Sequence, residues 1–195
     1  MQLKRDRRKI RLGSGWGRRK WSSYVKLALI LTFAVAIIFS GHRSWRGRAP
    51  SANEPFPPTI SGPADPIDGD SLWVGHDEVR LKGIDAPEWK QQCERAGGEP
   101  WRCGEAARDA LARLIGSDDV SCTIRKRDAY GRMLGHCHAG GRDLNAQMVI
   151  SGMAVAFGGY GNEQDKARSE RRGLWAGDFE EPRDWRAMHD WEEAR

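Results

Sequence analysis

An apolar run from Leu27 to Phe39 divides this chain into two parts that cannot share one fold. Ten basic residues lie between Lys4 and Lys26, ahead of the run, and only three more follow it before residue 49. A basic segment followed by an apolar run is typical of a signal peptide or a signal anchor. We therefore expect residues 1–48 to be a basic arm and targeting segment, with the folded domain further along the chain.

Two fates of this segment are possible. Thirteen residues match the apolar core of a signal peptide, whereas a bilayer span takes about 20, which the run reaches only with its flanking residues. No small-x-small pair follows the run, which favours an uncleaved membrane anchor over a secreted protein. The charge excess before the run places the N-terminus in the cytoplasm and the domain on the periplasmic or extracellular side of the cell membrane. Arg18-Arg19 also loosely resembles a twin-arginine export signal.

Proline use marks the next boundary. Six of the nine prolines lie between Pro50 and Pro66, so residues 49–66 are predicted to be an extended linker. The domain is then expected at 67–178. In the tail, 179–195, the three-residue spacing of Trp185, Met188 and Trp191 predicts a short amphipathic helix lying on the domain. We expect a monomer.

The charge of the chain is uneven. Residues 1–48 hold 13 of the 32 basic side chains and one of the 27 acids, so the other 147 residues carry 19 basic and 26 acidic side chains, a net charge of −7. A broad basic face for nucleic acid is therefore not expected. Any such contact should be confined to a local cleft.

All four cysteines lie after the apolar run, and an even number in an exported domain predicts two disulfides. Cys122 and Cys137 lie symmetrically about a turn-like Asp-Ala-Tyr-Gly sequence, so we expect them to pair across a hairpin, with Cys93–Cys103 in the loop after Glu88. The alternative, a zinc site, is disfavoured because His136 and His138 would lie on the opposite strand face from Cys137.

Hydrophobic patterns predict an α+β domain. Five segments are of strand type: 71–74, 78–84, 120–125, 133–138 and 153–157. Three are helical: 105–115, 144–151, and a segment from Asn162, the expected N-cap, to residue 172.

Three short motifs carry the candidate chemistry. They read Asp68-Gly69-Asp70-Ser71, Arg80-Leu81-Lys82-Gly83-Ile84-Asp85-Ala86-Pro87-Glu88 and Asp128-Ala129-Tyr130-Gly131-Arg132. Carboxylate oxygens are the ligands of hard divalent cations, and guanidinium groups bind phosphate oxygens in bidentate fashion. Each motif alone is common in turns and helix starts. Together they predict metal-assisted phosphodiester cleavage.

In this order and spacing, from about Ile67 to Trp175, the motifs resemble the thermonuclease family, the staphylococcal-nuclease-like proteins. The resemblance implies a five-stranded OB-type β-barrel with three packed helices. It also implies that Asp70, Asp85 and the Ala86 main-chain carbonyl bind Ca²⁺, and that Glu88 activates or orients water. The roles it implies for the remaining residues are phosphate binding by Arg80 and Arg132, support of the metal site by Asp68 and Ser71, and base stacking on Tyr160.

The activity implied is Ca²⁺-dependent hydrolysis of DNA and RNA with little sequence preference. Gly158 stands where the family would have a second tyrosine, which weakens the expectation of tight nucleotide binding. The alternative function is a non-catalytic OB-type module that binds nucleic acid or protein. The complete set of acids and arginines favours the enzyme.

Overall fold

The computed structural model describes residues 55–193, with side chains up to residue 189. The predicted basic arm, the apolar run and the first part of the predicted linker lie outside these residues. Among the residues described, no helix is long and apolar enough to cross a membrane.

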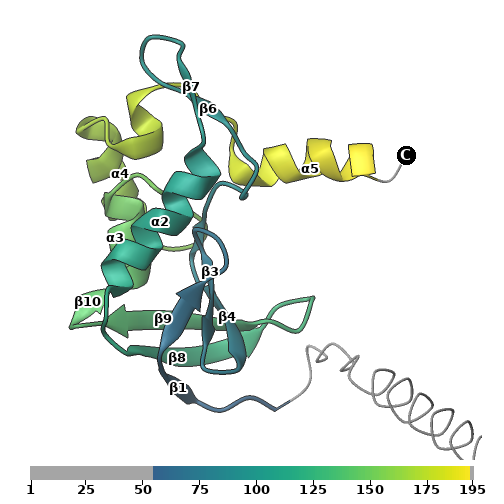
Figure 1. The fold of residues 1–195 in the computed structure, drawn as a ribbon, viewed down its shortest axis with the longest axis vertical. Coiled ribbons are helices and arrows are strands. Elements are labelled where there is room, and N and C mark those ends of the chain that lie inside the picture. The colour runs from purple at the N-terminus through teal and green to yellow at the C-terminus, as the bar shows by residue number, and fades with distance from the viewer. Residues whose placement is uncertain (1–54, 194–195) are drawn as a thin grey trace, which may run out of the picture. The chain divides into compact units, whose positions relative to one another are not determined.

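One mixed sheet of seven strands forms the base of the domain (Figure 1). Its order is β1-β8-β9-β4-β3-β2, with β10 paired to β9, and all neighbours are antiparallel except β4 and β9. The strands are β1 (Thr59–Gly62), β2 (Ala64–Pro66), β3 (Ser71–Val74), β4 (Asp77–Leu81), β8 (Val120–Arg127), β9 (Met133–Ala139) and β10 (Arg142–Asp143). Together with the helices, the sheet confirms the predicted α+β class.

The sheet forms because its longest strands alternate between buried and exposed residues. In β8, Val120, Cys122 and Ile124 are buried while the residues between them are exposed, and β9 shows the same period. Side chains two residues apart share one face of a strand, so this pattern packs one face of the sheet against the core.

The prediction that residues 49–66 form a linker is wrong for residues 59–66. β1 pairs with β8 and β2 pairs with β3, at opposite ends of the strand order, and only Pro63 separates them in the chain. Proline is tolerated in such short edge strands because no ladder hydrogen bond is needed from its nitrogen. Ile60, 8 % exposed, adds apolar surface to the core. Among the pairings of the described strands none joins β1 to β2, so what the structure shows is a mixed sheet.

The expected strand at 153–157 does not belong to this sheet. Only β11 (Val155–Ala156) forms there, and it pairs with β5 (Ile84–Asp85) in a separate two-stranded sheet. A third small sheet joins β6 (Cys93–Glu94) to β7 (Pro100–Trp101). The pairing of β11 with β5 matters for the site because Asp85 lies in β5.

Four α-helices complete the described domain. They are α2 (Cys103–Ile115), α3 (Leu144–Ile150), α4 (Gly161–Ser169) and α5 (Pro182–Glu193), and a 3-10 turn, η1, spans Gly173–Ala176. In Figure 1, α2, α3 and α4 lie on one side of the main sheet, and α5 extends away from them. The expected N-cap at Asn162 is wrong: α4 begins at Gly161, after Tyr160 with φ of 62°.

Both predicted disulfides are confirmed. Cys122–Cys137 joins paired residues of β8 and β9 in the core, and Cys93–Cys103 ties β6 to the first residue of α2. These four are all the cysteines of the chain, so none is left to bind zinc.

Candidate active site

Asp70 is held in a buried turn between β2 and β3. The carboxylate of Asp68 accepts hydrogen bonds from the backbone N–H groups of Asp70 and Ser71, at 2.9 and 2.7 Å, which fixes the turn. The Ser71 hydroxyl donates to Asp70 Oδ1 at 3.1 Å, and the Ala86 N–H donates to Asp70 Oδ2 at 3.0 Å. Asp68 therefore shapes the turn, while Ser71 and Ala86 orient the Asp70 carboxylate.

Two close approaches support this arrangement. A Cβ atom at Gly69 would lie 2.6 Å from Ala86 Cβ and 2.7 Å from Ala107 Cβ, so only glycine lets the turn pack against the residue that follows β5 and against α2. A Cβ atom at Gly104, in the first turn of α2, would overlap the carbonyl oxygen of Glu88. The start of α2 thus packs directly against the loop that carries Glu88.

Arg80 joins the two aspartates. It lies opposite Ser71 on β4, and its Nη2 is 2.8 Å from Asp70 Oδ2 and 2.6 Å from Asp85 Oδ1. Both aspartates are almost fully buried, at 1 % and 3 % exposed. Two carboxylates in one buried place repel each other unless a positive charge lies between them, and here Arg80 supplies it.

The electrostatics of Asp70 favour a further cation. Burial is the main cause that raises the pKa of Asp70 to about 8, and the charges of Asp68 and Asp85 act in the same direction. Arg80 and the hydrogen bond from Ala86 lower it, but not enough to offset the burial. A bound divalent cation would favour the ionised carboxylate, since an opposite charge nearby lowers a carboxyl pKa.

The donor set fits a hard cation with few protein ligands. Carboxylate oxygens of Asp70 and Asp85 both contact Arg80 Nη2, at 2.8 and 2.6 Å, so the two oxygens lie close enough together for one Ca²⁺ or Mg²⁺ ion to bind both in place of that nitrogen. Within residues 55–189, no cluster of three or more His, Cys, Asp and Glu side chains could hold a metal. An ion here would need main-chain oxygen, water or substrate to complete its shell, which Ca²⁺ and Mg²⁺ accept.

Glu88 lies beside this pair on a tight turn. Gln91 is fully buried, and its side-chain oxygen accepts a hydrogen bond from the backbone N–H of Glu88 at 3.1 Å. The backbone N–H of Gln91 donates to the Glu88 carbonyl oxygen at 2.8 Å. The Glu88 side chain is 29 % exposed, so water can reach its carboxylate.

Sequence reasoning missed Arg186, which completes the cluster. From α5, its Nη1 lies 2.7 Å from Glu88 Oε1 and 3.1 Å from Asp85 Oδ1, and its Nη2 lies 2.9 Å from Asp85 Oδ2. Burial opposes its charge, but the hydrogen bonds to Asp85 and Glu88 raise the pKa of Arg186 above its usual range. The spacing that predicted the tail helix rested on Trp185, Met188 and Trp191, and it contained no sign of the contact made by Arg186.

Arg132 lies apart from that cluster. Its Nε donates to Asp128 Oδ2 at 2.8 Å, within the turn between β8 and β9. None of the hydrogen bonds or ion pairs in the described part of the chain links it to Asp85 or Glu88. Burial opposes its charge, but Asp128, Glu78 and Asp70 together raise the pKa of Arg132, so the field of Asp70 reaches it. Tyr130, 77 % exposed, lies under its guanidinium and is an aromatic contact that the sequence reasoning did not single out.

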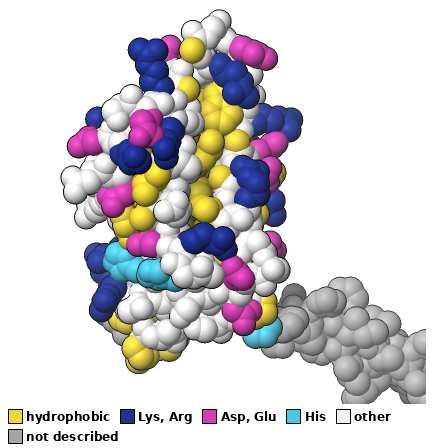
Figure 2. Space-filling view, turned by 90° about the vertical axis from the view of Figure 1, so that its left-hand side faces the viewer, with side chains coloured by type: hydrophobic (Ala, Val, Ile, Leu, Met, Phe, Trp, Pro, Cys, Tyr) yellow, Lys and Arg dark blue, Asp and Glu magenta, His cyan; other side chains and the backbone are white. Residues whose placement is uncertain are grey.

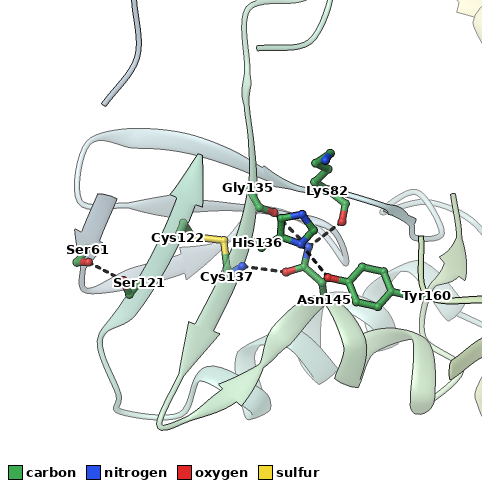
Figure 3. The surroundings of a disulfide bond; sticks show 9 residues. All are labelled: Ser61, Lys82, Ser121, Cys122, Gly135, His136, Cys137, Asn145 and Tyr160. Atoms are coloured by element: carbon green, nitrogen blue, oxygen red, sulfur yellow. Dashed lines mark hydrogen bonds between the residues drawn. A yellow bond between two sulfur atoms is a disulfide. The ribbon is translucent and has the colours of Figure 1, made fainter. Parts of the chain in front are cut away.

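Tyr160 is only partly available for stacking. Its hydroxyl and His136 Nδ1 are 2.9 Å apart, and Figure 3 shows this contact. Burial, with the charges of Asp143 and Glu163, raises the pKa of Tyr160 to about 12. One edge of the ring approaches Gly83, so a base would have to stack on the opposite side.

The molecular surface agrees with the acidic balance of the domain. On the face shown in Figure 2, Lys and Arg side chains alternate with Asp and Glu and do not merge into a continuous basic area. This face therefore has no continuous basic area of the kind that the sequence also led us not to expect.

Comparison with known proteins identifies the relatives of the domain. Residues 78–177 match the family model described as "Staphylococcal nuclease homologue". Over 142 residues the chain is 36 % identical to the micrococcal nuclease of Shigella flexneri, which covers 62 % of this chain and 76 % of the relative. It is 38 % identical over 123 residues to "Succinoglycan biosynthesis protein ExoI" of Rhizobium meliloti, covering 60 % of this chain and 64 % of that protein. A third relative, the "Probable staphylococcal-like nuclease CAN3" of Oryza sativa subsp. japonica, is 36 % identical over 115 residues.

The matches cover only part of each relative. The chain spans 64 % of the length of the Rhizobium protein and 28 % of the rice protein, and the rice match covers 55 % of this chain. Arg80, Asp85, Glu88 and Arg132 lie within the family match, whereas Asp70 precedes it and Arg186 follows it.

Proposed function

The chain belongs to the staphylococcal nuclease family, and from this premise we propose that it is a Ca²⁺-dependent phosphodiester hydrolase that cleaves DNA and RNA with little sequence preference. One observation carries the proposal. Buried carboxylate oxygens of Asp70 and Asp85 converge within 2.8 Å of a single nitrogen of Arg80, with the Glu88 carboxylate alongside. This is the local combination of acids and arginines that hydrolysis of a phosphodiester requires.

Asp70, Asp85 and the main-chain carbonyl of Ala86 would hold the cation. When bound, Ca²⁺ would offset the negative charge that develops on the phosphate oxygens. Ser71 and the Ala86 N–H keep the Asp70 carboxylate oriented through their hydrogen bonds. Asp68 contributes by fixing the turn, not by contact with the ion.

Glu88 would take a proton from the attacking water, or orient that water. Its carboxylate is partly exposed and lies next to Asp85, since one nitrogen of Arg186 contacts both groups. Gln91 and the tight contact with Gly104 fix the loop that carries it. A positioned carboxylate of this kind contributes about 10²–10⁴-fold to a rate.

Arg80 and Arg132 would bind the phosphate. Arg80 is held by the two aspartates, and a cation that took over their oxygens would leave its planar fork to donate two hydrogen bonds to one phosphate. Arg132 is held by its ion pair with Asp128 and lies over the Tyr130 ring, so it would contact the phosphate from the β8–β9 turn.

Arg80 and Arg132 would contact the phosphate backbone, and Tyr160 would contact the face of a base. None of these contacts involves a base edge, which supports weak sequence preference. Tyr160 would stack on a base with its free side. Its partial burial, and Gly158 in place of a second aromatic residue, support modest nucleotide affinity.

We also propose the wider organisation. The two disulfides support an extracytoplasmic domain, and the charge step across residues 27–39 supports a single-pass anchor with a cytoplasmic N-terminus. Because β1 and β2 are consecutive in the chain yet end the strand order, the sheet curls back on itself, which supports an OB-type barrel.

The proposal is tested by incubating the purified chain with plasmid DNA and with RNA, in chelator and after Ca²⁺ is restored. We expect cleavage of both only with Ca²⁺, and its loss in the Asp85→Asn variant. Binding of single strands without cleavage in any condition would instead support the non-catalytic module.

A further inference from the structure

Arg186 occupies the carboxylates that the proposed cation needs. It binds both oxygens of Asp85, at 3.1 and 2.9 Å, and Glu88 Oε1 at 2.7 Å. Asp85 Oδ1 also receives Arg80 Nη2 at 2.6 Å, so both oxygens of this buried carboxylate are already engaged by guanidinium groups.

A cation and this arginine exclude each other. Ca²⁺ binds carboxylate oxygen at about 2.3–2.6 Å, and the Arg186 nitrogens stand only slightly farther from the same oxygens. Two positive groups so close would repel strongly in a buried site. Asp85 can therefore bind the cation only after Arg186 has at least partly withdrawn and Arg80 Nη2 has given up its own contact with Asp85 Oδ1.

The segment that leads into the N-terminus of α5 is fixed to the loop that carries Glu88. Gln91, which orients Glu88 through one end of its amide, donates from the other end to the Glu180 carbonyl at 2.7 Å. A bridge between Glu94 and Asp178 and the buried Pro182 hold the same segment. The chain therefore enters α5 at a constant place beside the site.

The body of α5 is held more weakly. Ala187 and Met188 are exposed, and the Trp185 ring stacks on His189 of the same helix, with ring centroids 4.0 Å apart, instead of entering the core. Figure 1 shows the helix extending from the domain. The ion pairs of Arg186 are thus the main polar link between the described body of the helix and the domain.

We propose that α5 is an inhibitory segment in which Arg186 competes with the divalent cation for Asp85 and Glu88, so that cation binding releases the helix from the site. This inference rests on the proposed function. It adds a closed form of the enzyme, in which Arg186 binds Asp85 and Glu88. In the open form Ca²⁺ has replaced Arg186 at these carboxylates. The apparent affinity for Ca²⁺ is then the intrinsic affinity multiplied by the fraction of open molecules.

The direct test is calorimetric titration of the purified full chain with Ca²⁺, for wild type, Arg186→Gln and Arg183→Gln. If about nine molecules in ten are closed, Arg186→Gln should bind Ca²⁺ about tenfold more tightly than wild type. Arg183→Gln is the matched control, because it removes the same charge from an exposed position of the same helix. It should change the affinity much less.

Hydrogen exchange separates release from a simple change of charge. In wild type, saturating Ca²⁺ should speed amide exchange in residues 182–189, and in Arg186→Gln this segment should exchange rapidly with or without Ca²⁺. Equal Ca²⁺ affinity in all three proteins, or unchanged exchange of α5 on Ca²⁺ binding, would overturn the inhibitory role and leave the proposed nuclease intact. A chain that binds no Ca²⁺ in any variant would overturn both proposals.

Discussion

Asp70 and Asp85 are joined through a single nitrogen atom: Arg80 Nη2 lies 2.8 Å from an oxygen of the first and 2.6 Å from an oxygen of the second. The two aspartates come from a turn before β3 and from the short strand β5, so the sheet and the small β5–β11 pair are both needed to bring them together. This relationship defines the candidate site, and several measurable properties follow from it.

The contribution of Asp70 to the stability of the metal-free protein should decrease as the pH rises from about 4 to 8. Asp70 has a pKa raised from 3.8 to about 8, so between these values the native state holds a proton that the unfolded chain has released. Its stabilising contribution is present at low pH and is lost as the pH rises through the native pKa. In chelator, melting temperatures of wild type should therefore fall relative to those of Asp70→Asn over this range. Parallel curves for the two proteins would contradict the assignment.

Arg80→Lys should impair both the site and the reaction. Lysine keeps the charge but lacks the planar fork that can bind phosphate in bidentate fashion. Loss of one charge-assisted contact costs about 1.5–3 kcal/mol, so kcat/KM should fall by roughly 10–150-fold. Arg102→Lys is the control, because Arg102 forms an exposed ion pair with Glu105. A similar loss of activity in both variants would show that the effect is not specific to the site.

Removal of the Cys122–Cys137 bond should destabilise the domain. The bond closes a loop with a sequence separation of 15 in the core between β8 and β9, and such a loop contributes about 3 kcal/mol in the chain-entropy model. The double substitution of both cysteines by alanine should lower the melting temperature by several degrees. An unchanged melting temperature would mean that the bond adds no net stability.

Tyr160→Ala should mainly raise KM. Base stacking contributes about 1–3 kcal/mol, which corresponds to about 5–150-fold in KM if the free side of the ring binds a base. Tyr160→Phe keeps the ring and removes only the hydroxyl bonded to His136, so its KM should stay close to wild type. If Tyr160→Phe is as impaired as Tyr160→Ala, the hydroxyl matters and stacking is not the role of this residue.

Local patterns in the sequence predicted much of the architecture. The alternation in β8 and β9, the end of α2 at Ile115 and the start of α3 at Leu144 depend on side chains close in the chain, and the structure has them near the expected places. The hairpin symmetry that predicted Cys122–Cys137 is local in the same sense.

Contacts between distant segments could not be predicted in this way. Residues 59–66 look like part of a linker because they end the proline-rich stretch that begins at Pro50, and they become strands only through partners in β8 and β3. Arg186 reaches Asp85 across 101 residues of sequence, and its position depends on how Gln91 and Glu94 fix the segment before α5. The residue spacing within the tail therefore contains no indication of the contact between Arg186 and Asp85.

The most direct test of the central claim is the rate of phosphodiester cleavage by wild type and Glu88→Gln, measured on the same DNA with Ca²⁺ and with chelator. We expect wild type to cleave only with Ca²⁺, and Glu88→Gln to be slower by about 10²–10⁴-fold in kcat, because a positioned carboxylate base contributes that much. Calorimetry should show that the variant still binds Ca²⁺. Full activity of Glu88→Gln, or cleavage by wild type in chelator, would contradict the assignment of this acidic cluster as the active site.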